Sequence, residues 1–94
     1  MDMNVNMEIV VIKLPSKIGR KLSQDDLKYC ILALANGDTL ANLSTKVNMS
    51  GPAIGKHIDK IFKISFGFYD RTITLNRIKY AKKVIFKTIV KIEK

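Results

Sequence analysis

Side chains that could do covalent or acid–base chemistry are few in this chain of 94 residues. The chain has one cysteine, Cys30, and one histidine, His57, and neither has a partner at a spacing typical of a nucleophile or a metal site. The adjacent acids Asp25 and Asp26 come soon after Ser23, where they are explained as the acidic first turn of a helix. We therefore predict that the protein is not an enzyme and uses no cofactor or metal.

The chemistry that the sequence favours is binding of a polyanion. The 17 lysines and arginines outnumber the 8 acids and give a net charge of +9, which favours nucleic acid or an anionic membrane surface as a partner. Most of the excess lies in residues 71–94, which hold eight bases and one acid. The candidates for phosphate contacts are four lysines and a hydroxyl: Lys46, Lys56, Lys60, Lys63 and Thr39. The alternative is that these lysines simply form a solvated face.

Three predicted helices would position these side chains, and the first contains the lone cysteine. It begins after Ser23, an N-cap, and ends at Asn36-Gly37. Its apolar residues recur at helical spacing: Leu27, Ile31, Leu34 and Ala35. Cys30 lies within this apolar run, and we predict a buried structural thiol.

The second and third predicted helices are joined by a tight turn at Asn48-Met49. Asp38 or Thr39 caps the second helix, in which Leu40, Leu43 and Val47 share one face. Ser50 caps the third, which has Pro52 in its first turn. Its buried stripe is Ile54, Ile58 and Ile61. Two helices and a tight turn are the outline of a helix-turn-helix.

The segment from Gly37 to His57 resembles the DNA-binding domain of LuxR-type regulators. That family has a Gly, a hydroxyl residue two positions on, an aliphatic–Ala pair, a Leu, an aliphatic–Ser pair, Thr-Val-Lys and a His. The residues at matching spacings are Gly37, Thr39, Leu43, Ser44, Val47, Met49, Ser50, Ala53, Ile54 and His57, with Leu22-Ser23 matching the opening of the family's first helix. The likeness spans residues 22–64, and it implies a helix-turn-helix domain that binds DNA and regulates transcription.

A second resemblance concerns the third helix alone. The run Ser50-x-Pro52-Ala53-Ile54-Gly55-Lys56 is similar to a stretch of LysR-type regulators. Those proteins continue into a two-stranded wing, and residues 65–75 could form one. The two resemblances agree on a recognition helix that starts near Ser50, and they differ on the structure of the segment after that helix.

The resemblances imply a geometry in which the third helix enters the major groove and the second crosses the DNA backbone. The residues expected near DNA are Ser50, Gly51, Ala53, Gly55 and Lys56. Small side chains allow a close approach of the backbone but make few base contacts, so only Lys56 has the reach for a guanine edge. We expect His57 to be a helix-surface or packing residue.

The two ends of the chain each allow more than one secondary structure. Residues 7–14 are β-branched and stop at Pro15, which suits a short strand or an extended arm, and this stretch is too short to span a membrane. We predict a helix over residues 76–92, with Ile78, Ile85 and Ile89 on its apolar stripe. That helix would form a dimer seam, pack as a fourth core helix or lie on a membrane. Alternation of apolar and polar residues also fits a strand paired with residues 7–14.

Taken as a whole, residues 1–94 are predicted to form one mainly α helix-turn-helix domain with a core over residues 22–64 and a C-terminal helix. The predicted function is a cytoplasmic, homodimeric, sequence-specific transcription regulator that binds double-stranded DNA and not a membrane. Two alternatives remain open. The chain could be an interaction protein that binds another regulator, or a nonspecific nucleic-acid binder acting through its basic tail.

Overall fold

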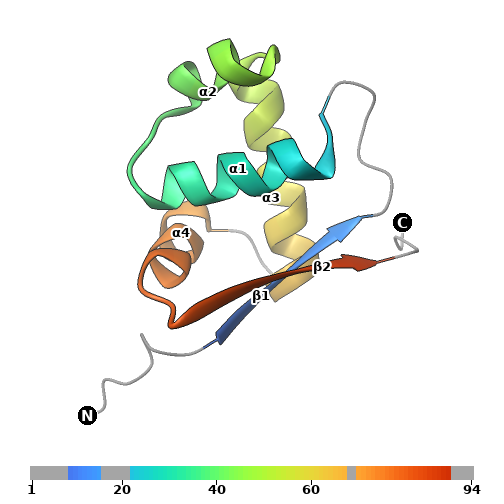
Figure 1. Ribbon diagram of the computed structural model, residues 1–94, viewed down its shortest axis with the longest axis vertical. Coiled ribbons are helices and arrows are strands. Elements are labelled where there is room, and N and C mark those ends of the chain that lie inside the picture. Colours follow the sequence, from blue (N-terminus) through green and yellow to red (C-terminus); the bar gives the residue numbers. More distant parts are fainter. Residues whose placement is uncertain (1–8, 16–21, 68–69, 90–94) are drawn as a thin grey trace.

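Two strands from near the ends of the chain pack together with four helices from its middle. The computed structural model describes residues 9–15, 22–67 and 70–89. The elements are β1 (Ile9–Pro15), α1 (Gln24–Ala35), α2 (Leu40–Val47), α3 (Gly51–Phe66), α4 (Arg71–Lys79) and β2 (Lys83–Ile89). The described part is thus a mainly helical domain with a short sheet beside its helices (Figure 1).

The predicted N-terminal caps of the first three helices are confirmed. Ser23, Thr39 and Ser50 each accept a hydrogen bond through the side-chain oxygen from the backbone N–H three residues on, at 3.1, 3.1 and 3.3 Å. These bonds satisfy donors that the first turn of a helix leaves without a partner. Asn36 and Gly37 come directly after the end of α1 as predicted, and Gly37 has a φ of 101°. Local capping chemistry therefore fixes where α1, α2 and α3 begin.

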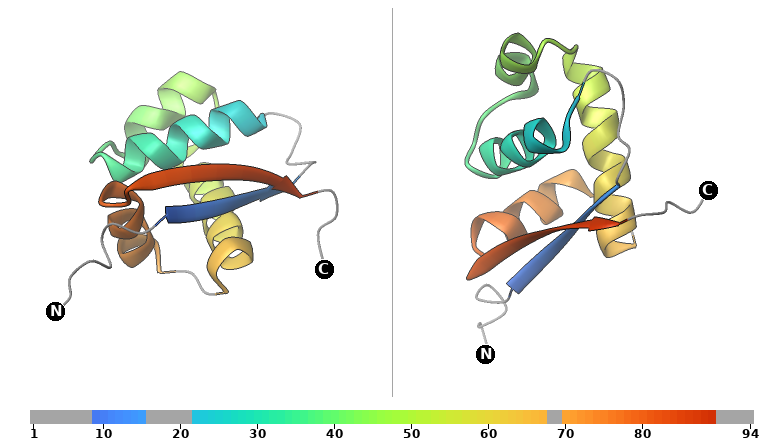
Figure 2. Two further views of the ribbon diagram at one scale, coloured as in Figure 1. Left: turned by 60° about the horizontal axis from the view of Figure 1, so that its bottom comes forward. Right: turned by 45° about the vertical axis from the view of Figure 1, so that its right-hand side comes forward.

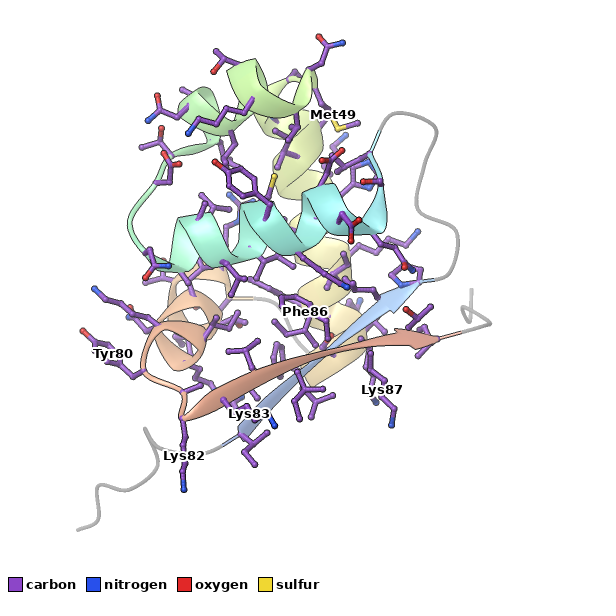
Figure 3. The ribbon with its side chains drawn as sticks, viewed as in Figure 1. Met49, Tyr80, Lys82, Lys83, Phe86 and Lys87 are labelled. Carbon is purple, nitrogen blue, oxygen red and sulfur yellow. The ribbon has the colours of Figure 1, made fainter. Side chains whose placement is uncertain are left out.

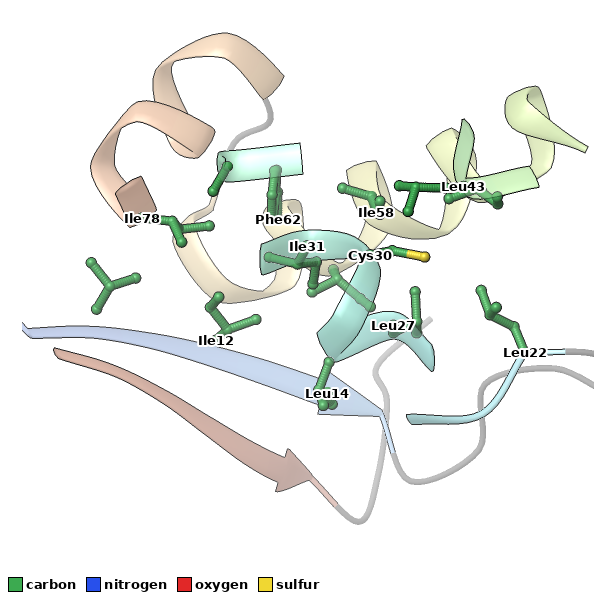
Figure 4. Close-up of a cluster of buried hydrophobic side chains, with 14 residues drawn as sticks. Ile12, Leu14, Leu22, Leu27, Cys30, Ile31, Leu43, Ile58, Phe62 and Ile78 are labelled. Carbon is green, nitrogen blue, oxygen red and sulfur yellow. The ribbon is translucent and has the colours of Figure 1, made fainter. Parts of the chain in front are cut away.

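The core lies between the sheet and the helices. The predicted stripes pack into it, with Leu43 of α2 and Ile54 of α3 fully buried, and the side chain of Cys30 is also fully buried, as expected. Ile12 and Leu14 point from β1 toward the helices (Figure 4). The side chains of β1 are therefore part of the same hydrophobic core as those of the helices.

The two strands form a parallel pair, with Ile12 in register with Phe86. The predicted N-terminal strand is confirmed over its described part, where Val10, Ile12 and Leu14 alternate inward. In the left view of Figure 2 the strands lie in front of the helices, so the viewer looks onto a sheet face that no described helix covers.

The predicted C-terminal helix over residues 76–92 is wrong. α4 ends at Lys79, a turn comes next, and residues 83–89 are the strand β2; residues 90–92 lie outside the described residues. Val84 and Phe86 are half-buried and alternate with exposed residues, as expected for a strand with one face on the core. The alternative prediction, a strand paired with the N-terminal strand, is therefore the correct one for residues 83–89. Residues 83–89 therefore present no helical face for the dimer seam expected there.

The wing considered for residues 65–75 is also wrong for the described part of that segment. α3 continues through Phe66 and α4 begins at Arg71, with Asp70 as its N-cap. The Asp70 carboxylate accepts a hydrogen bond from the Ile73 N–H at 3.1 Å. Thr74 and Ile78, one helical turn apart, are the buried residues of α4. The segment therefore adds a helix that covers the core.

Candidate nucleic-acid interface

The exposed face of α3 carries three lysines. Lys56, Lys60 and Lys63 are all exposed, and their spacing of i, i+4 and i+7 puts them on one side of the helix. The opposite side is buried through Ile54, Ile58 and other core residues. With 16 residues, α3 is about 24 Å long. The structure thus brings the three predicted lysines of α3 together on one basic, solvent-facing surface.

A three-residue connection joins α2 to α3. Asn48 ends α2 in the left-handed region with a φ of 55°, a conformation that asparagine tolerates better than most residues, and Ser50 then starts α3. Gly51 lies close to α2, because a Cβ there would come within 3.4 Å of the Leu40 Cβ. A small residue at the start of α3 therefore lets the two helices pack closely.

Gly55, one of the residues expected near DNA, lies between α3 and its neighbouring helices. The residue is buried, and a Cβ at this position would approach the Arg71 Nη2 to 3.0 Å and the Leu40 Cδ1 to 3.4 Å. Gly55 therefore faces α2 and α4 and not outward with the lysines. Its physical role is to make space for the Arg71 guanidinium, so it does not belong to the exposed lysine face of α3.

An ion pair between α3 and α4 was missed by sequence reasoning. The Arg71 Nε and Nη2 donate to the two carboxylate oxygens of Asp59 at 2.9 and 2.8 Å. This hydrogen bonding to Asp59 raises the pKa of Arg71. Asp59 is the one acid in the sequence of α3, so its charge is engaged within the protein and does not offset the exposed lysines. A twelve-residue separation across two helices gives no sequence signal for such a pair.

The surface beside these residues is a shallow groove of about 520 Å³. Its walls come from both helices and from Arg71: Leu40, Ala41, Ser44, Gly51, Pro52, Gly55 and Arg71 line it. Of the residues expected near DNA, Ser50 is exposed, whereas Gly51 and Ala53 are half-buried. The start of α3 thus presents small side chains and an accessible backbone next to an apolar hollow.

The two other predicted phosphate contacts are Thr39, the N-cap of α2, and Lys46 in its last turn. The Thr39 hydroxyl is exposed and already accepts the capping hydrogen bond from Asn42. The Lys46 ammonium donates to the Tyr29 hydroxyl of α1 at 3.2 Å, and this bond raises the pKa of Lys46. Lys46 is therefore held against α1, and no described contact brings it to the lysines of α3. His57 is half-buried on α3, in keeping with the helix-surface or packing role expected for it.

A second basic surface lies on the side of the sheet away from the helices. Lys82, Lys83 and Lys87 project there, as Figure 3 shows. Lys13 of β1 is in register with Lys87, so two lysines are neighbours across the strand pair. The basic tail was recognised from the sequence, but its pairing with β1 depends on residues more than 70 positions apart.

Comparison of the chain with protein-family models, curated proteins and solved structures finds no match. Within the described ranges, no helix is long and apolar enough to cross a membrane, and no His, Cys, Asp and Glu side chains gather as a metal site would require.

Proposed function

We propose that this chain is a DNA-binding transcription regulator in which α2 and α3 act as a helix-turn-helix and α3 enters the major groove. The observation that carries this proposal is the exposed lysine face of α3, formed by Lys56, Lys60 and Lys63 opposite the buried stripe. The engagement of Asp59 by Arg71 leaves that face uniformly basic. Such a face matches the phosphates that line a DNA groove.

The proposed contacts divide along the length of α3. Near its N-terminus, Gly51 and Ala53 are small enough for the helix backbone to approach the base edges, and the exposed Lys56 has the reach for the acceptors of a guanine. Lys60 and Lys63 lie further along the same face, where they would contact phosphates. We infer that the base-reading part of the interface is small and that its affinity is mainly electrostatic.

In the same arrangement α2 would lie across the DNA backbone. The exposed Thr39 hydroxyl can donate to a phosphate while its oxygen accepts the capping bond from Asn42. Lys46 has a defined position because Tyr29 holds its ammonium. These contacts would orient the domain on DNA without reading sequence.

The test is selection of bound sequences from a random pool of double-stranded DNA, with affinity measurements on the selected site. We expect Lys56→Ala and Lys60→Ala each to weaken binding and to lower the slope of log affinity against log salt by about one unit. Lys28→Ala, which removes a lysine of α1 instead, is the matched control and should leave both quantities nearly unchanged. Equal affinity of the two α3 variants and the wild type would overturn the placement of α3 in the groove.

A second candidate function is nonspecific nucleic-acid binding through the outer side of the sheet. The neighbouring Lys13 and Lys87, with Lys82 and Lys83, favour it. Selection from the random pool separates the two functions, because a nonspecific binder enriches no motif and is displaced equally by any competitor DNA. Failure to bind any DNA would instead favour an interaction protein that binds another regulator.

A further inference from the structure

The two outer edges of the sheet differ in how they are protected. On the β1 edge, the Lys13 N–H donates to the Ser65 hydroxyl of α3 at 2.8 Å. Pro15, at the end of the same strand, has no N–H to offer. On the β2 edge, no backbone hydrogen bond joins the strand to any other described residue. The β1 edge is therefore blocked at Lys13 and Pro15, whereas the β2 edge has no backbone hydrogen bond to the described residues outside β1, and such an open edge can pair with a further strand.

The direction of the peptide groups on β2 can be deduced from the Lys13 bond. Since the Lys13 N–H points away from β2, the peptide groups of its neighbour Ile12 point toward β2. Ile12 is in register with Phe86, so in a parallel ladder it bonds to the residues on either side of Phe86. The N–H and C=O groups of Val84, Phe86 and Thr88 consequently point to the open edge.

We propose that the open edge of β2 pairs with the same edge of a second copy of this chain, antiparallel and centred on Phe86. The two-stranded sheets of both copies then join into one four-stranded sheet with two-fold symmetry. In this register Phe86 bonds to Phe86 of the other copy, and Val84 bonds to Thr88 on either side of it. Each of these is a pair in which both residues exchange N–H and C=O bonds, as the outward direction of their peptide groups requires.

Charge selects this register from its neighbours. Centring on Phe86 uses all seven residues of β2 and puts Lys83 opposite Ile89, and Lys87 opposite Ile85, of the other copy. A register centred on Ile85 would put Lys83 directly opposite Lys87, which is unfavourable. One centred on Lys87 would place two lysines face to face. The positions of the two lysines in β2 therefore favour the register centred on Phe86 over the registers shifted to Ile85 or Lys87.

A second copy fits this edge better than a strand from an unrelated protein. An isologous pair requires a sequence that complements itself about a centre, and residues 83–89 do so on both faces. Pairing of the two copies would also widen the exposed face of the sheet. On that face Lys83 and Lys87 of each copy would lie next to Ile85 and Ile89 of the other, so the lysines of both copies would come close together. That gathering of lysines predicts an association that strengthens when salt screens their repulsion.

The first experiment measures the oligomeric state of the full chain without DNA by sedimentation over a range of concentrations and salt. We expect a dimer whose dissociation constant falls as salt rises. Thr88→Pro removes an outward N–H and should weaken association at least about tenfold, whereas Thr88→Ala keeps the N–H and should associate like the wild type. Thermal melting monitored by circular dichroism checks that both variants are folded. A wild type that is monomeric throughout, or a Thr88→Pro variant that still dimerises, overturns the proposal.

The second experiment tests the register without disturbing the backbone. Ile85→Lys puts a new lysine opposite Lys87 of the other copy and should weaken the dimer. Adding Lys87→Glu puts a carboxylate opposite each new lysine and should restore the association, while Lys87→Glu alone, which removes a lysine from the crowded face, should associate at least as tightly as the wild type. If the double variant is no stronger than Ile85→Lys, the register centred on Phe86 is wrong. Because neither experiment contains DNA, their outcome is independent of the proposed DNA binding.

Discussion

At the scale of single residues, the surroundings of a side chain decide what it does. Cys30 could be predicted as buried because it stands within an apolar helical run, and it is fully buried. Burial raises the pKa of its thiol, and Asp26 and Asp38 add to this effect. Gly55 could not be placed correctly, since its neighbours Leu40 and Arg71 come from other helices. The type of a residue predicts its preference for burial but not the partner that fills the space beside it.

The buried Thr74 of α4 makes a residue-scale prediction. Its side chain is fully buried, and its hydroxyl has no hydrogen-bond partner among the described residues. A buried hydroxyl without a partner costs free energy, and valine has nearly the same shape without that oxygen. We expect Thr74→Val to raise the free energy of unfolding by about 1 kcal/mol. Urea unfolding with Thr72→Val, an exposed site on the same helix, as control checks this. A destabilised Thr74→Val variant would show that the hydroxyl is satisfied in solution.

At the scale of elements, the sequence predicts what local chemistry controls. Caps such as Ser23 and Ser50 and the apolar stripes placed α1, α2 and α3 correctly, because both signals act within a few turns. Residues 83–89 carried a helical stripe and a strand alternation at once. The strand β1 resolves the conflict by offering a pairing partner that no local window contains. The same conflict explains why residues 76–79, the end of α4, are predicted from the sequence as part of a helix that continues to residue 92.

The packing of α2 against α3 gives the element-scale prediction. Leu43 and Ile54 are fully buried and belong to the same core cluster, on two helices that contact each other. Leu43→Ala and Ile54→Ala should each lower the free energy of unfolding by about 2–5 kcal/mol, because each leaves a cavity that the neighbouring side chains fill only in part. Leu32→Ala, at a residue that is 39% exposed, is the control and should cost much less. Denaturant unfolding monitored by circular dichroism measures all three, and wild-type stability of both core variants would contradict the observed helix register.

At the scale of the whole molecule, the sheet ties the two ends of the chain to one core. β1 and β2 are separated by the four helices in sequence, yet they pair along their full length. Gln24 at the start of α1 reinforces the junction, as its side-chain amide donates to the Pro15 carbonyl at 2.6 Å. The predicted core over residues 22–64 is therefore only part of the folding unit. The helices within residues 22–64 could be predicted from local sequence. Their packing against the strands could not, because it depends on the pairing of β1 with β2 from opposite ends of the chain.

This arrangement predicts that the isolated fragment 22–64 does not fold cooperatively. In the full chain, Leu27 and Ile31 of α1 lie in one buried cluster with Ile12 and Leu14 of β1 (Figure 4). Removing both strands and α4 exposes that apolar surface, and a chain of this length has little other surface to bury in its place. We expect the fragment to show a broad, non-cooperative thermal transition by circular dichroism, whereas the full chain melts sharply. In the full chain, Ile12→Ala should lower the free energy of unfolding by about 2–5 kcal/mol, as much as Leu43→Ala or Ile54→Ala, because the strand and the helices unfold as one unit. A fragment that melts sharply, or an Ile12→Ala variant as stable as the wild type, would instead make the strands an accessory to an autonomous helical domain.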